Sequence, residues 1–263
     1  MMDDPVYNTI GQTYTATRAA DPRITRSLLD HLAVKHGQTI LDIGAGTGNY
    51  SQALAEAGLQ VTALEPSEVM RKQGKQHPRL QWVHGKAESL PFENGAFDAC
   101  IMTLCLHHFA DWKLALTEAC RVAESGPLVL FTFDPDTDRR FWLLDYFPEF
   151  QTKDQAWFPP LPEVAAFASN TLNRKTTITP FPLPPDLVDH FCAAGWRRPE
   201  IYLEGSYRAG ISSFSNVSED SVAIGLAKLR EDLQSGRWEE AYGAVRNLGS
   251  LDVGYVFLRF SIE

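Results

Sequence analysis

The first half of the chain alternates short apolar runs with segments whose apolar residues recur at helical spacing. The runs have the length of buried strands and lie at residues 40–43, 61–64, 80–84, 97–103 and 128–133. Helices are expected before and between them, at residues 22–37, 49–57, 67–76 and 111–122. Strands that alternate with helices in this way indicate a parallel sheet built from crossover units.

The second half of the chain is less regular. Residues 141–162 contain seven aromatic residues among prolines and have no clear period, so we expect a lid or cap there. The patterns that follow predict a loop, a short helix, a strand, two helices and a half-exposed strand, at residues 180–185, 186–194, 199–204, 218–236, 237–246 and 255–262.

A glycine-rich turn follows the first predicted strand. Residues 40–51 read Ile-Leu-Asp-Ile-Gly-Ala-Gly-Thr-Gly-Asn-Tyr-Ser. Gly44, Gly46 and Gly48 remove Cβ where the backbone turns and passes close to a ligand, and the next residues open a helix. Glu65 ends the second apolar run, near the spacing of about 20 residues at which an acid can accept hydrogen bonds from ribose hydroxyls. The pattern predicts a site for a nucleotide-type cofactor.

A third motif, Gly-Lys-Ala-Glu-Ser-Leu-Pro-Phe at residues 85–92, completes a resemblance. With the other two, it resembles the class I S-adenosylmethionine-dependent methyltransferases, in the small-molecule, UbiE-like branch of type 11 methyltransferases, over most of residues 5–135. The resemblance implies an α/β, Rossmann-like, seven-stranded and mostly parallel sheet with helices on both faces, an antiparallel last strand and a helical cap. It also implies S-adenosyl-L-methionine as the cofactor and S-adenosyl-L-homocysteine as the product.

The resemblance assigns roles to residues of the three motifs. Asp42 and the glycine turn would hold the methionine end of the cofactor, and Glu65 the ribose. Where the family has an acid that contacts adenine, this chain has Lys86, which has no hydrogen-bond acceptor. Either Glu88 replaces that acid, or the adenine is held by the Ala87 backbone and by packing. The expected cofactor residues are Tyr14, Arg18, Asp42, Gly44, Ala45, Gly46, Gly48, Asn49, Glu65, Pro66, Met70, Ala87, Glu88, Thr103 and Leu104.

Tyr14 and Arg18 precede the first predicted helix and follow no core pattern. Similar residues in the resembling family fold over bound cofactor, where a guanidinium can pair with the methionine carboxylate through a bidentate fork. The alternative is an arm that simply packs on the sheet.

His107 and His108 follow the fourth predicted strand, at the sheet edge where open α/β sheets bind ligands. One of them could take the proton of a methyl acceptor. Alternatively, His107 packs beside the cofactor through its backbone and His108 faces solvent. Positioning should dominate in either case, because a sulfonium is already an activated leaving group.

The aromatic residues of the predicted cap also allow two interpretations. Trp142, Tyr146, Phe150 and Trp157 would line a substrate pocket, or the aromatic segment forms only the core of the cap. A pocket of this kind would favour an apolar or aromatic acceptor.

The composition of the chain limits the classes of molecule that it is expected to bind. The chain has 33 acidic residues against 24 Lys plus Arg, for a net charge of -9, which opposes binding to nucleic acid. No 18-residue apolar run or export signal is seen, so we expect a cytoplasmic protein with no membrane partner. The four cysteines and the His pair lack metal-site spacing, so no metal is expected.

We expect a single domain that acts as a monomer or homodimer on a small-molecule acceptor. Its parts would be an N-terminal arm and helix over the cofactor, a cofactor-binding core, two cap insertions and a final strand, at residues 1–36, 37–135, 136–180 with 205–250, and 254–262.

The predicted activity is transfer of a methyl group to an O, N or C atom of a small, apolar or aromatic metabolite by in-line attack. One alternative is a partner protein that binds the cofactor without catalysis. Another is a nicotinamide-dependent oxidoreductase, but the third glycine comes one residue early for that fingerprint, and Asp42 suits a ligand with an ammonium and a sulfonium.

Overall fold

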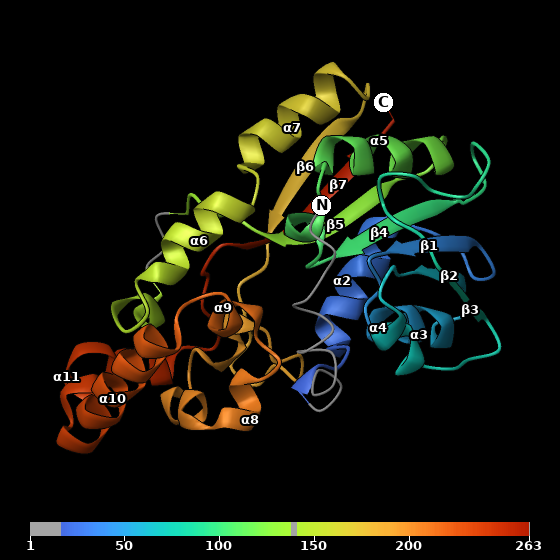
Figure 1. The fold of residues 1–263 in the computed structure, drawn as a ribbon. Coiled ribbons are helices and arrows are strands. Elements are labelled where there is room, and N and C mark those ends of the chain that lie inside the picture. Colours follow the sequence, from blue (N-terminus) through green and yellow to red (C-terminus); the bar gives the residue numbers. More distant parts are fainter. Residues whose placement is uncertain (1–16, 138–140, 263) are drawn as a thin grey trace.

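The computed structural model describes residues 17–137 and 141–262 (Figure 1). Within these residues seven strands form one sheet, in the order β3-β2-β1-β4-β5-β7-β6. The strands are β1 (Thr39–Ile43), β2 (Gln60–Leu64), β3 (Leu80–Val83), β4 (Ala99–Thr103), β5 (Leu128–Phe133), β6 (Lys175–Pro180) and β7 (Tyr255–Ser261).

The first five strands are parallel to one another, and β7 runs antiparallel between β5 and β6. The predicted Rossmann-like sheet with an antiparallel last strand is therefore confirmed. Each of the first five strands was also expected at nearly its observed position. Their carboxyl ends meet at one edge of the sheet, beside which the glycine turn lies.

Helices cover both faces of the sheet (Figure 1). The described helices are α2 (Pro22–Leu32), α3 (Asn49–Glu56), α4 (Glu68–Lys72), α5 (Trp112–Val122), α6 (Glu149–Trp157), α7 (Leu161–Asn170), α8 (Gly205–Arg208), α9 (Ser212–Ser215), α10 (Glu219–Ser235) and α11 (Arg237–Tyr242). Apolar residues of α2 and α3 pack on one face in one core cluster, and those of α5 and α7 pack on the other face in a second.

Side-chain caps explain where the predicted helices begin. Asp21 accepts a hydrogen bond from the backbone N–H of Arg23 at the start of α2. Asp111 and Ser218 each accept a hydrogen bond from a backbone N–H in the first turn of α5 and α10, respectively. Helix α4 ends earlier than expected. A Cβ at Gly74 would lie 2.5 Å from the Trp82 ring, so the chain turns here in a form that only glycine fits.

Two predicted elements in the second half are wrong. Residues 199–204 are not a strand, because Pro199–Leu203 forms a 3₁₀ turn that buries Tyr202, whose hydroxyl donates to the Cys192 carbonyl at 2.7 Å. The expected helix at 186–194 is reduced to a 3₁₀ turn, Cys192–Gly195. Its preceding residues instead place the buried side chain of Asp189 against other parts of the chain.

The edge strand β6 was not predicted, and it lies in a segment that we expected to belong to the cap. It is mostly exposed and polar, so it carries no apolar run. Its pairing with β7 also corrects the expectation that residues 255–262 form a half-exposed strand. Because β7 has a neighbour on each side and packing on both faces, Tyr255, Val256, Phe257, Leu258 and Phe260 are all buried.

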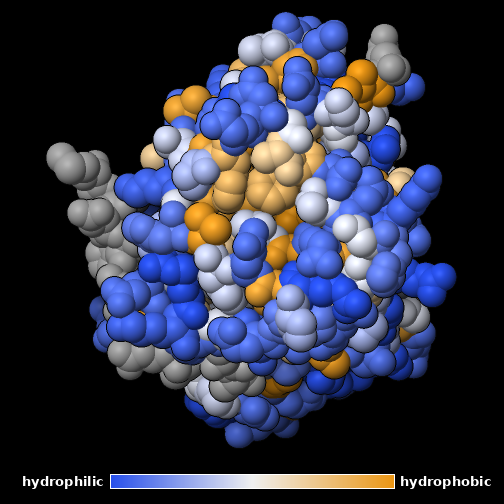
Figure 2. Space-filling model, turned by 90° about the vertical axis from the view of Figure 1, so that its right-hand side faces the viewer, coloured by the Kyte–Doolittle hydropathy of each residue, from blue (hydrophilic) through white to orange (hydrophobic). Residues whose placement is uncertain are grey.

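The remaining helices, α6 and α8 to α11, gather beyond one end of the sheet (Figure 1). Their core includes three large aromatic side chains, Trp142, Trp196 and Trp238, and is continuous with the cluster under α2 and α3. The side of the molecule that lies to the right in Figure 1 is mostly hydrophilic, with a patch of hydrophobic residues near its centre and a few others scattered around it (Figure 2). Among the described residues, none of the helices has the length and apolar character needed to cross a bilayer.

Candidate functional site

The turn between β1 and α3 has a left-handed backbone at Gly44 (φ +73°) and Gly46 (φ +58°). A Cβ at Gly44 would lie 3.0 Å from the Cβ of Cys105, so a side chain there would displace the turn after β4. Gly48 is also left-handed (φ +74°), but its missing Cβ makes room for the Trp82 ring and it does not line the cleft described below. Its requirement is therefore packing rather than contact with a ligand.

Two acidic side chains border this turn. Glu65 accepts hydrogen bonds from the backbone N–H groups of Gly46 and Ser67, both at 2.9 Å, which fixes its carboxylate beside the loop. Asp42 is buried and accepts a hydrogen bond from the Ser51 hydroxyl. Burial, together with the nearby Glu65 charge, raises the pKa of Asp42 to about 7 despite that hydrogen bond. The pair therefore favours a cation in the cleft.

A cleft of about 140 Å³ opens between the glycine turn, the end of β2 and the end of β4. Most of the expected cofactor residues line it, namely Arg18, Asp42, Gly44, Ala45, Gly46, Asn49, Glu65, Pro66, Met70, Thr103 and Leu104. It is also lined by His108, which we expected as a catalytic residue, and by residues that we did not predict, namely Thr47, Tyr50, Cys105, Phe109 and Asp189. Thr47 and Tyr50 lie within the glycine-rich motif, whereas Asp189 carries no sequence signal.

The expected adenine contacts lie elsewhere. Neither Glu88 nor Ala87 is among the residues that line the cleft, and the Glu88 carboxylate accepts a hydrogen bond from the Ala110 backbone at 2.9 Å. Ala87 is buried in the core cluster on the α5 side. Tyr14 lies outside the described residues. The adenine contacts stay a prediction.

Arg18 makes its bidentate contact with another part of the chain. Its guanidinium forms an ion pair with Asp189 through Nε, and its Nη2 lies 3.2 Å from the second carboxylate oxygen. The Tyr50 hydroxyl donates to the same oxygen at 2.9 Å. The fork that we expected to face a cofactor carboxylate is thus engaged by Asp189, which fixes Arg18 at the cleft.

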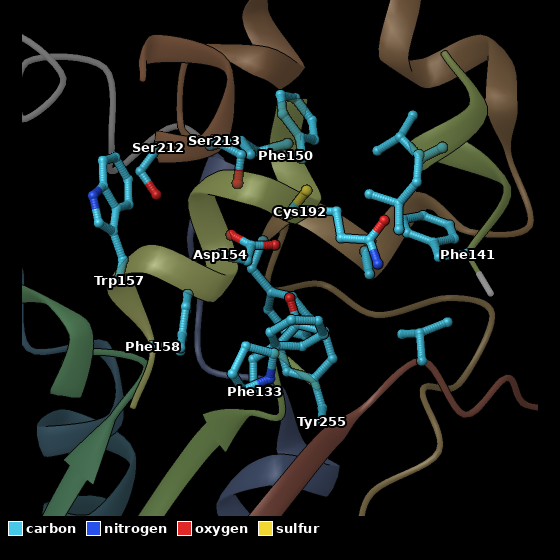
Figure 3. Close-up of a pocket in the computed structure, with 18 of the residues that line it drawn as sticks. Phe133, Phe141, Phe150, Asp154, Trp157, Phe158, Cys192, Ser212, Ser213 and Tyr255 are labelled. Carbon is cyan, nitrogen blue, oxygen red and sulfur yellow. The ribbon is translucent and has the colours of Figure 1, made fainter. Parts of the chain in front are cut away.

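A larger cavity of about 450 Å³ lies beside the cleft, between the end of the sheet and the cap (Figure 3). Its volume is in the range typical of small-molecule sites. Aromatic rings from distant segments provide much of its wall, including Phe133, Phe141, Phe150, Trp157, Phe158 and Tyr255.

Of the four expected pocket residues, Phe150 and Trp157 line this cavity, whereas Trp142 and Tyr146 do not. Trp142 is buried and donates from Nε1 to the Trp196 carbonyl at 2.7 Å. The Tyr146 hydroxyl donates to Asp232 at 3.0 Å. Their assignment to the pocket is corrected, because both side chains are used in the core of the cap.

The two histidines lie in a 3₁₀ turn, Leu106–His108, after β4. His107 lines the larger cavity and stacks on Phe158 with ring centroids 4.1 Å apart. Burial lowers the pKa of His107 well below its usual value, and burial together with Arg18 lowers that of His108 to about 4. His108 lines both hollows and keeps an exposed surface. Both rings are therefore neutral near pH 7.

The cleft and the cavity share one wall. Arg18, Leu104 and His108 line both. Leu104 has a left-handed backbone (φ +53°), which is costly for a branched side chain, and it is held there by a 2.8 Å bond from its N–H to the Phe131 carbonyl. The strained residue stands where two ligands would meet.

Comparisons with known proteins agree with this geometry. The model of the methyltransferase domain family matches residues 41–131. A solved structure from Anabaena variabilis, described as a methyltransferase from an antibiotic biosynthesis pathway, is 43% identical and superposes with a TM-score of 0.90, covering 94% of this chain and 99% of that one. The chain belongs to the class I S-adenosylmethionine-dependent methyltransferases. This assignment excludes the nicotinamide alternative.

Curated relatives share the cofactor half of this methyltransferase. A demethylmenaquinone methyltransferase from Renibacterium salmoninarum is 38% identical over 117 residues, which are 44% of this chain and 49% of the relative. A malonyl-[acyl-carrier protein] O-methyltransferase from Erwinia billingiae is 35% identical over 122 residues, or 46% and 49%. The chain spans about half the length of the curated relatives it matches, so their acceptors do not transfer directly.

Within residues 17–137 and 141–262, no group of three or more His, Cys, Asp or Glu side chains could hold a metal ion. Cys100, Cys105 and Cys120 are buried and free, whereas Cys192 lies on the wall of the larger cavity.

Proposed function

We propose that the protein transfers the methyl group of S-adenosylmethionine to an O, N or C atom of a small, apolar or aromatic molecule. The observation that carries the proposal is the shared wall of Arg18, Leu104 and His108 between the cleft at the glycine turn and the aromatic cavity. Because the two hollows adjoin at these residues, a methyl donor in the cleft and an acceptor in the cavity would meet there.

The residues of the cleft suit this cofactor. S-adenosylmethionine carries an ammonium and a sulfonium, and Asp42 is a buried carboxylate close enough to Glu65 for the two charges to interact. Glu65 uses its two oxygens for one backbone bond each, and an ionised carboxylate offers about four acceptor positions, so ribose hydroxyls can bind as well. When bound, the cofactor supplies the electrophilic methyl group.

The residues of the chain contribute mainly by positioning. Orientation of two bound reactants can remove about 7–11 kcal/mol of a barrier, whereas a positioned base typically contributes about 10²–10⁴-fold. A pKa of about 4 makes His108 a weak base at neutral pH, even though its ring is neutral and able to accept a proton. We therefore infer that His107 and His108 shape the meeting point of the reactants more than they move protons.

The first experiment is calorimetric titration with S-adenosylhomocysteine, with NAD as the negative control. A thermal-shift screen of apolar metabolites at saturating S-adenosylhomocysteine would then search for acceptors. A ligand at a hundredfold excess over its dissociation constant should add about 2.7 kcal/mol of stability. Binding of NAD but not S-adenosylhomocysteine would contradict the proposal.

Separate His107→Ala and His108→Ala variants distinguish an enzyme from a protein that only binds the cofactor. In an enzyme, turnover of an identified acceptor falls, with the larger loss at His108 because it borders both hollows. Affinity for S-adenosylhomocysteine should stay within a few-fold in His107→Ala, which lines only the acceptor side.

A further inference from the structure

Asp154 is an acid on an otherwise aromatic wall. It lies on α6 four residues after Phe150, so these two side chains share a helix face, and both line the larger cavity together with Phe158, which directly follows the helix. The carboxylate points into the middle of the cavity, with Cys192 and Tyr255 nearby (Figure 3). Neither the fold nor the cofactor cleft requires an acid at this position.

The Asp154 carboxylate has no hydrogen-bond or ion-pair partner among the residues that the structure describes. The second acid of the cavity, Asp145, differs in this respect, since it is exposed and accepts a hydrogen bond from the Tyr242 hydroxyl at 2.7 Å. A half-buried carboxylate without a partner is unfavourable for folding. Such a group is therefore a candidate for recognition of a ligand.

The other ionisable groups that face the cavity do not balance this charge. Arg18 is paired with Asp189, and the two histidines of η1 (Leu106–His108) are neutral at pH 7 because their pKa values are lowered. Burial raises the pKa of the Cys192 thiol to about 12 and that of Tyr255 well above its usual range, so both are uncharged. Among the described residues that line the cavity, no free positive charge thus balances an ionised Asp154.

The surrounding rings suit the same kind of ligand. Phe158, Phe133 and Tyr255 form a chain of contacts, with centroids 5.6 Å and 5.3 Å apart. Aromatic faces attract cations through their quadrupoles, and a carboxylate at the same site adds a charge-assisted hydrogen bond.

We propose that the cavity binds a small molecule with a protonated amine on an aromatic or apolar body, and that Asp154 holds the amine. That this molecule is the methyl acceptor rests on the function proposed above, whereas the binding itself does not. The site would then bind neutral molecules of the same shape more weakly.

The test uses matched probes that differ only in the amine. Calorimetry would compare 2-phenylethylamine with 2-phenylethanol, and tryptamine with tryptophol, in the presence and absence of S-adenosylhomocysteine. We expect at least one amine to bind tenfold or more tightly than its alcohol. The preference should fall to about one in Asp154→Asn, which keeps the size of the side chain, and should persist in the control Asp145→Asn.

The pH dependence of amine binding provides a second test. Burial raises the pKa of Asp154 to about 7, and only the ionised carboxylate attracts an ammonium. Amine affinity should therefore rise roughly tenfold from pH 6 to pH 8, where the ionised fraction grows from about one tenth to nine tenths. Alcohol affinity should not change over that range.

Equal binding of amines and alcohols, binding of neither amine, or an amine preference that survives Asp154→Asn would overturn the inference. These outcomes are separable from failure of the proposed function. If S-adenosylhomocysteine does not bind but the amine preference holds, only the methyltransferase proposal fails. If a neutral acceptor is methylated and amines have no advantage, only the role of Asp154 fails.

Discussion

The cofactor cleft and the larger cavity lie side by side, but different parts of the chain form their walls. Most of the cleft comes from three short stretches, at residues 42–50, 65–70 and 103–109, each of which directly follows or ends a parallel strand. The cavity is assembled from side chains of many segments between Leu104 and Tyr255, together with Arg18. One is a property of backbone turns at a sheet edge, and the other of side-chain packing across the cap.

This difference explains how the two sites can vary. A turn that needs a left-handed backbone at Gly44 and Gly46 tolerates few sequences. A cavity walled by aromatic side chains keeps its fold when one ring is exchanged for another of similar volume. The cleft therefore identifies the family, whereas the cavity would determine the acceptor under the proposed function, which agrees with curated relatives matching only the cofactor half.

The largest effect should come from a residue that we first assigned to the pocket. Trp142→Ala removes a buried ring and its hydrogen bond, and should lower the free energy of unfolding by about 3–5 kcal/mol. Trp157→Ala, at a side chain that is 38% exposed on the cavity wall, should cost less than about 1 kcal/mol. Chemical denaturation of both variants measures the difference. Similar losses would contradict the separation of cap core from cavity wall.

The next effect concerns the backbone turn. Gly46→Val places a branched side chain in the cleft and should weaken S-adenosylhomocysteine binding by at least about 100-fold, or roughly 2.7 kcal/mol. Gly37→Val is the matched control, because Gly37 is also left-handed (φ +87°) and a Cβ there meets nothing within 4 Å. Both variants should lose about 1–2 kcal/mol of stability, but only the first should lose binding. Binding retained in Gly46→Val would remove the loop from the site.

Most of the cleft could be predicted from the sequence, because short local patterns specify the strands and turns that form it. Apolar runs, glycines and caps mark the strands and turns, and parallel strands necessarily bring Asp42, Glu65 and Thr103 to one edge. The partner of Arg18 could not be predicted in this way. Asp189 lies 171 residues further along the chain, in a segment that we expected to be helical. Such a pair depends on how the cap meets the sheet, and no local period encodes it.

The walls of the larger cavity could not be predicted from local sequence patterns either. An aromatic residue has the same hydrophobic pattern whether it fills a core, as Trp142 does, or lines a hollow, as Phe150 does. The polar edge strand β6 was missed because it is mostly exposed, and β7 was expected to be half-exposed because its alternation does not show that side chains pack on both of its faces. Asp154 carries no motif at all. The role proposed for it follows only from the side chains that surround it in the fold.

A smaller effect is expected at Glu65. Glu65→Ala should weaken S-adenosylhomocysteine binding by about 10- to 150-fold, which corresponds to the roughly 1.5–3 kcal/mol of a charge-assisted hydrogen bond. The loss includes the two backbone bonds that Glu65 accepts from Gly46 and Ser67. Glu65→Gln keeps one acceptor oxygen and should lose less. Calorimetry that finds unaltered affinity in the alanine variant would exclude the ribose role.

The smallest effect is a pH dependence confined to the cleft. Burial raises the pKa of Asp42 to about 7 in the free protein, and only its ionised form attracts the ammonium of S-adenosylhomocysteine. Because this pKa is raised rather than lowered, affinity should fall as the pH drops, by roughly tenfold from pH 8 to pH 6, and binding should release a proton. Asp42→Asn keeps a partner for Ser51 but cannot ionise, so its weaker affinity should be independent of pH. A flat profile in the unmodified protein would show that the cofactor's cation is held elsewhere, and the cleft would then owe its selectivity to the backbone turn alone.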